Sequence, residues 1–317
     1  MWIVRDESGM RREAMLAIGV GEILWDRLPS GDEIGGAPFN VVSHLARFGY
    51  RAAYLTAVGQ DPPGDAAIAE MAGRGIDTSL VSRADGVPTG LAQVTVGPGG
   101  SPAFEIRRPA AFERWASGDA VQARVTEMQP DVLVYGTLAQ LRPGARDGLR
   151  RITAGCPDAL ALYDVNLRDG WWSKDVVAEL LQLASVVKLS ESEAHELAPV
   201  LGVSWASGAS AAAFSEALAT RLGLRGVAVT AGPDAASLWL DGAFAHAAPP
   251  DADVMDAVGA GDAFAAGLLD AIGRRLGAAA ALRRANALGT LVASRRGAQP
   301  AWTEAELAEL EAQPPPA

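Results

Sequence analysis

Short apolar runs recur along the chain, and between them apolar residues return at the spacing of a helix. The apolar runs predict six buried strands, over residues 17–20, 53–57, 132–135, 160–164, 185–189 and 226–230. The helical spacing predicts helices around residues 40–47, 65–72, 174–183, 192–200 and 211–222. Because strands and helices alternate, we expect an α/β fold with a central, mostly parallel sheet flanked by helices.

Two segments depart from this alternation. Residues 89–109 predict two strands around a Gly-Pro-Gly-Gly turn, and residues 24–34 predict a second, less regular strand pair. We expect these segments, over about residues 24–36 and 89–109, to form a small β lid over the carboxyl edge of the sheet. Open α/β sheets bind their ligands at that edge.

The length of the chain allows one large domain or two smaller ones. Residues 1–15 lack the apolar centre of a secretory signal, and we expect a ragged extension there. Residues 303–317 predict a short acidic helix followed by a proline-rich end. No uncharged apolar run approaches the length of a membrane span, so we expect a cytoplasmic protein.

Composition and charge narrow the classes of function. The 317 residues are 49% hydrophobic, which allows a large core, and carry a net charge of −11. An acidic surface repels nucleic acids and anionic membranes, so we expect neither as a partner. The single cysteine, Cys156, excludes an intrachain disulfide, and His44, His195 and His246 lack metal-ligand spacing.

The stretch DAVGAGDAFAAG, residues 256–267, carries the strongest chemical signal. Apolar residues at helical spacing follow Asp262, which predicts a helix that begins near Gly259–Gly261. Free amides at a glycine-rich helix start bind anions, and a carboxylate beside them can take a proton from an attacking hydroxyl. On this stretch alone, helix capping by Asp262 and close helix packing remain alternatives. The lysine of a P-loop is absent.

The same stretch closely resembles the second signature of the ribokinase-like (PfkB-type) carbohydrate kinases. Residues 35–65, GGAPFNVVSHLARFGYRAAYLTAVGQDPPGD, resemble the first signature. The resemblance extends over residues 16–302 and implies one kinase domain there. It implies a ribokinase-like fold and transfer of a phosphoryl group from MgATP to a sugar hydroxyl. It also implies that Asp262 is the general base, that the amides of Gly259, Ala260 and Gly261 neutralise developing charge, and that lid strands pair in a homodimer.

Three further stretches resemble sugar-side and phosphoryl-side segments of the family. GEILWD and GGAPFN imply sugar binding by Asp26, Gly35, Gly36 and Asn40. DVNLRDGWW resembles an Asp-x-Asn-x-Arg segment. It implies that Asp164, Asn166 and Arg168 line the cleft near the phosphoryl group, where Arg168 stabilises its oxygens.

The nucleotide side resembles the family with two departures. Ser190 stands where the family's Asn-x-x-Glu segment has asparagine, and Ala235 stands where the nucleotide loop often has a second glycine. The resemblance implies that Glu193 binds Mg²⁺ through water, that Thr230 and Gly232 approach the nucleotide phosphates, and that Asn286 lies beside the adenine. The region that holds a monovalent cation such as K⁺ in many relatives corresponds to Asp256, Val258, Gly297 and Ala298.

The identity of the substrate remains open at this point. GEILWD, GGAPFN and YGTLAQ look more like fructokinases than ribokinases, so we expect fructose or a related ketohexose. Other sugars, sugar acids and nucleosides are alternatives. A sugar phosphate would need a basic cluster, for which Arg107 and Arg108 are the candidates. A non-catalytic sugar-binding relative is the alternative that Ser190 and Ala235 keep open, whereas Leu24 replaces the third glycine that a dinucleotide-binding turn requires.

Overall fold

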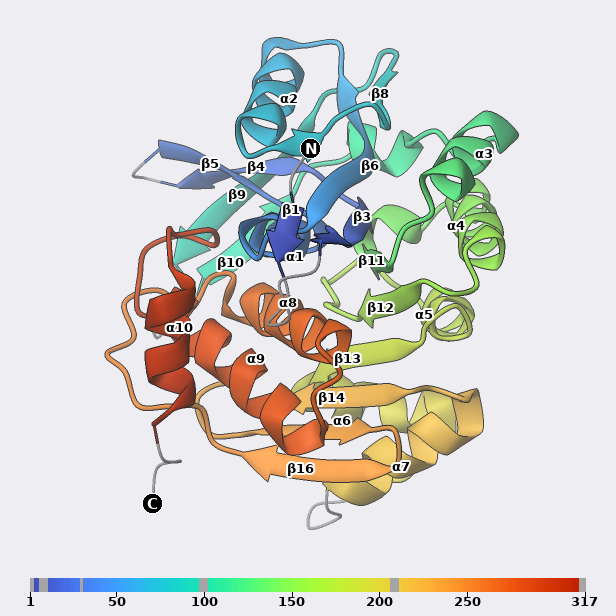
Figure 1. Ribbon diagram of the computed structural model, residues 1–317. Helices are drawn as coiled ribbons and strands as arrows, with labels where there is room; N and C mark the ends of the chain where they lie inside the picture. The colour runs from blue at the N-terminus through green and yellow to red at the C-terminus, as the bar shows by residue number, and fades with distance from the viewer. Residues whose placement is uncertain (1–2, 6–10, 29–30, 97–101, 206–210, 314–317) are drawn as a thin grey trace. The chain divides into compact units, whose positions relative to one another are not determined.

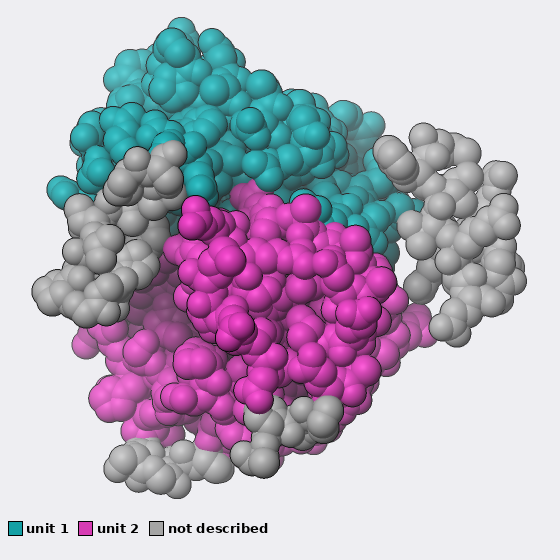
Figure 2. Space-filling view, turned by 90° about the vertical axis from the view of Figure 1, so that its left-hand side faces the viewer, with its two compact units in different colours: residues 1–133, 138–159 teal, residues 134–137, 160–317 magenta. Residues whose placement is uncertain are grey.

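The computed structural model describes residues 3–5, 11–28, 31–96, 102–205 and 211–313 (Figure 1). These residues form two compact units (Figure 2). Unit 1 comprises residues 1–133 and 138–159, and unit 2 comprises residues 134–137 and 160–317. The predicted Gly-Pro-Gly-Gly turn at 97–100 and the proline-rich end at 314–317 lie outside the described residues.

Unit 1 contains a parallel sheet with helices packed beside it (Figure 1). Its central strand, β6, pairs in parallel with β3, β7 and β8. The strands are β3 (Leu16–Val20), β6 (Arg51–Gly59), β7 (Ile76–Asp77) and β8 (Val81–Ala84). The helices are α1 (Ala37–Arg47), α2 (Pro62–Gly73), α3 (Asp119–Met128) and α4 (Pro143–Gly155), with 3₁₀ turns at Ala111–Arg114 and Leu138–Gln140.

The two predicted β segments join in one four-stranded sheet within unit 1. Its strands are β4 (Leu24–Leu28), β5 (Gly31–Gly35), β9 (Gly90–Val96) and β10 (Pro102–Ile106), in the order β10-β9-β4-β5. β4 pairs in parallel with β9, and the other two pairs are antiparallel. Because side chains alternate along a strand, Asp26 points to the opposite face of this sheet from Trp25 and Arg27.

The expectation of a ragged N-terminal extension is wrong in part. β1 (Ile3–Arg5) and β2 (Arg11–Glu13) pair antiparallel in a small sheet of their own. Each strand is only three residues long, so the hydrophobic pattern did not indicate them.

Unit 2 contains the second part of the α/β alternation. β12 (Leu160–Asp164), β13 (Val186–Ser190) and β14 (Gly226–Thr230) pair in parallel, and β15 (Ala236–Leu240) and β16 (Ala243–Ala247) extend the sheet antiparallel. The residues of β11 (Val132–Gly136) are divided between the units. Helices α5 (Lys174–Leu181), α6 (Glu191–Leu201) and α7 (Ala211–Leu222) complete the alternation. The predicted α/β class with mostly parallel strands is therefore confirmed.

Three helices end the chain: α8 (Ala260–Gly273), α9 (Ala278–Ala293) and α10 (Glu304–Glu311). A Cβ on Gly267 of α8 would lie 3.0 Å from the Cα of Ala285, and one on Gly289 of α9 would lie 3.1 Å from the carbonyl oxygen of Ala260. Small residues therefore let α8 and α9 pack backbone to backbone. Close packing and the helix start at Gly259 coexist in this stretch.

Ion pairs of the buried Arg284 connect α10 to the two helices before it. The guanidinium of Arg284 lies 2.6 Å from Asp270, 3.1 Å from Glu304 and 2.9 Å from Glu311. Leu307 of α10 is fully buried. The first part of the predicted tail is therefore packed into unit 2.

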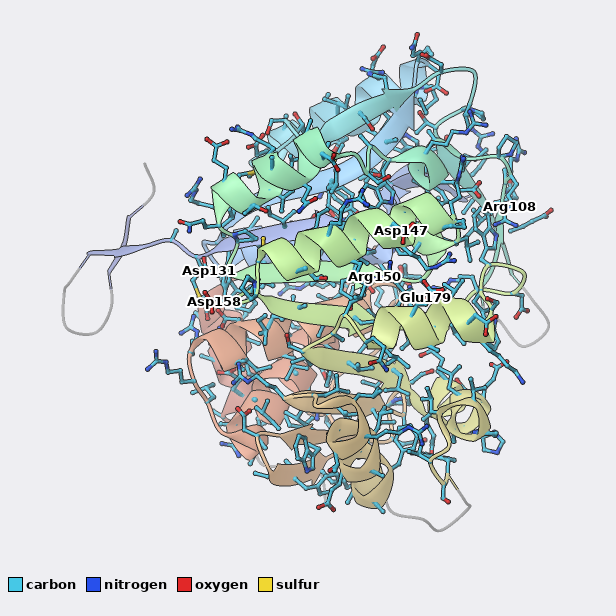
Figure 3. The ribbon with its side chains drawn as sticks, turned by 90° about the vertical axis from the view of Figure 1, so that its right-hand side faces the viewer. Arg108, Asp131, Asp147, Arg150, Asp158 and Glu179 are labelled. Carbon is cyan, nitrogen blue, oxygen red and sulfur yellow. The ribbon has the colours of Figure 1, made fainter. Side chains whose placement is uncertain are left out.

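Exposed ion pairs occur on the surface of the described residues. Figure 3 shows Asp147 and Arg150 side by side on α4, where their charged atoms are 2.5 Å apart and exposed. Such exposed pairs contribute at most about 1 kcal/mol to stability. Cys156 is buried, as predicted. Within the described residues, no helix is long and apolar enough to cross a membrane.

Candidate active site

The first turn of α8 has the backbone that its sequence predicts. Gly259 is the N-cap, with a left-handed φ of 78°, and its carbonyl accepts a hydrogen bond from the N–H of Ala263 at 2.8 Å. A Cβ at this position would lie 2.5 Å from the Cα of Ala298. Glycine is therefore required at 259 both for φ and for space. Asp262 is half-buried in the turn that follows.

One of the three amides expected to face an anion has a partner within the protein. The N–H of Ala260 donates to the carbonyl of Ala257 at 3.3 Å. The N–H of Gly261 lies in the first turn, where no carbonyl four residues earlier belongs to the helix. The positive end of the helix dipole adds to the attraction for an anion at this turn.

Asp256 fixes this turn to the loop that follows α9. Its Oδ1 accepts from the N–H of Val258, and its Oδ2 accepts from the N–H of Gly297, each at 3.0 Å. These residues belong to the region predicted to hold a monovalent cation. The carboxylate already joins the two segments through backbone amides, and a bound cation there stays a prediction.

A buried lysine under the same turn was missed by the sequence analysis. Lys188 of β13 is opposite Asp164 of β12 in the parallel register, and its Nζ lies 3.1 Å from both carboxylate oxygens. A Cβ on Gly261 would be 3.1 Å from this Nζ. The signal was a lysine inside a predicted buried strand, where an unpaired charge would be costly.

The charges around Lys188 shift the pKa of both partners. Burial, and to a smaller extent the carboxylates of Asp262 and Glu193, raise the pKa of Asp164 to about 7 against the lowering effect of the Lys188 ammonium. For Lys188, burial lowers the pKa, but the same three carboxylates outweigh it and hold the pKa above its usual value. Lys188 therefore stays protonated, because three carboxylates surround its ammonium group.

Ser190 and Glu193 form a reciprocal cap at the start of α6. The Oγ of Ser190 accepts from the N–H of Glu193 at 3.3 Å, and Glu193 Oε2 accepts from the N–H of Ser190 at 2.7 Å. Glu193 Oε1 accepts from the N–H of Leu167 at 2.6 Å. The Ser-x-x-Glu spacing of a capping box was the local signal for this pair. Both oxygens of Glu193 are thus held within the protein.

The Asp-x-Asn-x-Arg loop has an unusual backbone. Asn166 has a left-handed φ of 39°, which asparagine tolerates better than most residues. Arg168 is half-buried, and its Nη1 donates to the carbonyl of Leu167 at 3.1 Å. Because Glu193 binds the amide of Leu167, the loop is attached to the start of α6.

One cavity of unit 2 brings together most of the predicted nucleotide-side residues. It measures about 490 Å³ and opens between the first turn of α8, α9, the β14–β15 turn and the loop 249–257. Its lining includes Thr230, Gly232, Ala260, Gly261 and Asn286. Ala235 is not in this lining; its carbonyl accepts from the N–H of Ala231 at 2.8 Å and closes the β14–β15 turn.

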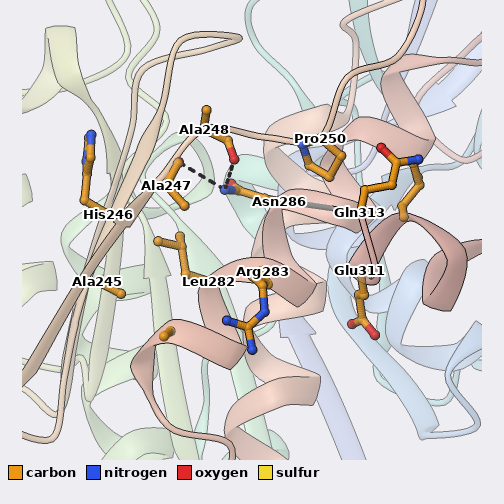
Figure 4. Close-up of a pocket in the computed structure, with 12 residues that line it drawn as sticks. Ala245, His246, Ala247, Ala248, Pro250, Leu282, Arg283, Asn286, Glu311 and Gln313 are labelled. Carbon is orange, nitrogen blue, oxygen red and sulfur yellow. Dashed lines mark hydrogen bonds between the residues drawn. The ribbon is translucent and has the colours of Figure 1, made fainter. Parts of the chain in front are cut away.

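Asn286 lies between this cavity and a smaller one beside β16. Its Nδ2 donates to the carbonyls of Ala247 and Ala248, at 3.2 and 3.4 Å (Figure 4). Asn286 is 5% exposed and lines both cavities. The side-chain amide therefore attaches α9 to the end of β16 at the wall of the larger cavity.

The predicted sugar-side residues gather in unit 1. Asp26 Oδ2 would lie 2.5 Å from a Cβ on Gly35, so the carboxylate rests directly on that glycine. Gly36, with a φ of 131°, is the N-cap of α1, and its carbonyl accepts from the N–H of Asn40 at 2.8 Å. Asn40 is 6% exposed. The structure thus places the Gly-Gly turn between Asp26 and Asn40.

Glu22 supports this turn and was not singled out in the sequence. Its side chain is buried, and Oε1 accepts from the N–H of Ala37 at 3.1 Å in the first turn of α1. Its carbonyl accepts from the hydroxyl of Tyr54 at 2.6 Å and would lie 2.3 Å from a Cβ on Gly36. Glu22 and Ala37 are fifteen residues apart in the sequence, so no local pattern indicated this hydrogen bond.

Among the described residues, no group of three or more histidine, cysteine, aspartate and glutamate side chains is arranged to hold a metal ion. Glu193 Oε2 accepts two hydrogen bonds from Ser190, and Oε1 accepts one from Leu167, so a lone pair is left only on Oε1. That lone pair can accept a hydrogen bond from a water molecule of a hydrated Mg²⁺, which commonly keeps several waters.

Comparison with known proteins places these features in a family. Residues 31–305 match the model of the pfkB family of carbohydrate kinases. Fructokinase-1 of Zea mays is 26% identical over 327 residues, which cover 93% of this chain and 97% of the relative. Aminoimidazole riboside kinase of Salmonella typhimurium is 28% identical over 279 residues, or 84% of each chain.

A solved structure agrees over nearly the whole chain. The crystal structure of a fructokinase with bound ATP from Xylella fastidiosa has a TM-score of 0.76 and 25% identity, and covers 94% of this chain and 97% of its own. The expected ribokinase-like fold is thereby confirmed. Because the family model spans most of the sequence, the chain belongs to the pfkB family of carbohydrate kinases.

Proposed function

We propose that this carbohydrate kinase transfers the γ-phosphoryl group of ATP to a hydroxyl of fructose or a related ketohexose. The first turn of α8 carries the proposal, because it combines a half-buried Asp262 with an anion-binding helix start that lines a cavity. Thr230, Gly232 and Asn286, which were predicted on the nucleotide side, line the same cavity. The fructokinase relatives and the ATP-bound relative support the choice of sugar and of nucleotide.

The proposed step is an in-line displacement. The sugar hydroxyl gives its proton to the carboxylate of Asp262 as its oxygen bonds to the γ-phosphorus. The bond between that phosphorus and the β–γ bridging oxygen breaks, and ADP leaves with the electron pair. The amide of Gly261 and the dipole of α8 stabilise the charge that develops on the phosphoryl oxygens.

Magnesium would be held mainly by the nucleotide phosphates and by water, with Glu193 as an outer contact. Bound Mg²⁺ supplies charge neutralisation on the β- and γ-oxygens. Glu193 keeps the Asp-x-Asn-x-Arg loop in place through the amide of Leu167. Arg168, in that loop, adds a guanidinium that can stabilise the transferred group.

Binding of the sugar is assigned to Asp26, Gly35, Gly36 and Asn40 of unit 1. A polyol needs acceptors and donors on its hydroxyls, which the carboxylate of Asp26 and the amide of Asn40 provide. The Gly-Gly turn lets backbone approach the sugar closely. We call the four-stranded sheet β10-β9-β4-β5 the lid sheet. Its closure over the sugar would exclude water, which otherwise accepts the phosphoryl group.

The non-catalytic alternative loses support at both substituted positions. Ser190 makes a complete capping box with Glu193, and the turn at Ala235 closes by a backbone hydrogen bond. Neither substitution leaves a local defect at the site.

A substrate panel tests the proposal. With MgATP, we expect fructose to give the highest kcat/KM among fructose, ribose, gluconate-type acids, nucleosides and fructose 6-phosphate, measured by ADP release. Asp26→Asn should raise the KM for the sugar and leave the KM for ATP nearly unchanged, because Asp26 is assigned to the sugar and not to the nucleotide. A higher kcat/KM for any other compound overturns the assignment of fructose.

We also propose a homodimer that forms through the lid sheet. Among the described strands, β5 and β10 are the outer strands of that sheet and pair on one side each. The outer edges of a sheet favour pairing with another chain. Light scattering at micromolar concentration should give twice the mass of the 32.8 kDa chain. A mass of one chain across the concentration range contradicts the dimer.

A further inference from the structure

Lys188 is a buried charged residue that the mechanism above does not use. Its side chain is 10% exposed and that of Asp164 is 1% exposed. Both carboxylate oxygens of Asp164 accept from the ammonium at 3.1 Å. Taking two charges out of water costs several kcal/mol per ion, so a buried pair is weak evidence for a role in stability alone.

Three acidic groups from separate segments act on this one ammonium. Asp164 ends β12, Glu193 lies in the first turn of α6, and Asp262 lies in the first turn of α8. All three carboxylates raise the pKa of Lys188. Without the lysine, these three negative charges would repel one another in a region of low dielectric.

The position of Gly261 shows how close the ammonium is to the turn of α8. A Cβ on Gly261 would lie only 3.1 Å from Nζ of Lys188, which is tighter than ordinary contact. The glycine before Asp262 therefore leaves room for the lysine. Lys188 lies on β13, so its ammonium group lies between the sheet and Gly261, the residue before the proposed base.

We propose that Lys188 is a positioning residue that holds the carboxylate of Asp262 in place for proton abstraction. This inference rests on the proposed function. The ammonium attracts the Asp262 carboxylate toward the sheet and offsets its repulsion from Asp164 and Glu193. With this charge removed, repulsion displaces the Asp262 carboxylate, and a displacement of 1 Å can cost about 100-fold in rate.

The competing role is that of a structural counter-ion for Asp164. Both roles predict that Lys188→Met lowers the melting temperature, because it leaves the Asp164 carboxyl buried without its partner. Only the positioning role predicts that Lys188→Met lowers kcat strongly when Asp262 is present and weakly when Asp262 is replaced by asparagine. A double-mutant cycle between positions 188 and 262 therefore separates them.

The experiment measures kcat and both KM values for wild type, Lys188→Met, Asp262→Asn and the double variant. We expect Lys188→Met to lower kcat by about 100-fold in the wild-type background and by less than about threefold in the Asp262→Asn background. The KM for the sugar should change by less than about threefold, since Lys188 acts on the proposed base rather than on the sugar. An equal loss of kcat in both backgrounds overturns the proposal.

A second pair of variants tests the proposal even if Lys188→Met folds poorly. Asp164→Asn/Lys188→Met removes both charges of the buried pair and is compared with Asp164→Asn. We expect the double variant to have a melting temperature above that of Lys188→Met, yet a kcat about 100-fold below that of Asp164→Asn. Equal kcat values overturn the proposal. If the proposed function itself fails, the wild-type protein releases no ADP with any sugar, which is a separate outcome.

Discussion

Asp262→Asn is expected to lower kcat for the sugar by about 10²–10⁴-fold, with little change in the KM for ATP. Asparagine has nearly the same shape but cannot accept the proton of the attacking hydroxyl. The amide of Gly261 and the dipole of α8 remain, so nucleotide binding should persist. ADP release with saturating ATP and sugar measures the loss.

Asp175→Asn is the matched control. Asp175 is also an aspartate in the first turn of a helix, α5, and is exposed. It shares the favourable interaction with a helix dipole but has no assigned chemistry. Its kcat should equal that of wild type. A fully active Asp262→Asn variant would exclude Asp262 as the base.

Gly259→Ala has the second-largest expected effect. An alanine at the φ of 78° costs about 1–2 kcal/mol, and its Cβ would lie 2.5 Å from the Cα of Ala298. The obstacle is backbone, so the turn of α8 must move. We expect kcat to fall by about 100-fold, because Gly261 and Asp262 move with the turn.

Gly73→Ala is the control for this substitution. Gly73 ends α2, and a Cβ there meets nothing within 4 Å. Its kcat should match wild type, and its melting temperature should stay equal or rise. If Gly259→Ala kept both the kcat and the melting temperature of wild type, this would contradict the claim that position 259 requires glycine.

The parts of the fold that the sequence predicted correctly have strong local patterns. The strands 160–164 and 226–230 are runs of buried residues, and their observed bounds equal the predicted ones. The start of α8 was predicted because glycines precede a helical apolar repeat. The lid strands were predicted because a turn-forming stretch separates two alternating segments.

Elements with weak patterns were missed. α3 has one buried residue, Val125, so its apolar repeat is faint. α4 buries Ala145 and Gly148 besides two larger residues, and β16 is largely exposed. A helix or strand that buries few side chains, or only small ones, leaves no clear apolar repeat in the sequence.

The candidate site shows a similar limit. Ser190 and Glu193 have a local spacing from which their capping box could be predicted. The contact of Glu22 with the amide of Ala37 depends on how the chain folds. The pairing of Lys188 with Asp164 depends on the register of two strands 24 residues apart. Sequence patterns therefore indicated the proposed reacting groups, whereas the groups that hold them depend on the fold.

The central claim is that this chain transfers the γ-phosphoryl group of ATP to a sugar. Phosphorus NMR of the purified protein with Mg²⁺, ATP and fructose tests it most directly. The account predicts that the γ-phosphate signal disappears while ADP and a sugar phosphomonoester appear in equal amounts, and that Asp262→Asn slows this conversion by orders of magnitude. Inorganic phosphate as the only new product, or unchanged ATP, would contradict it.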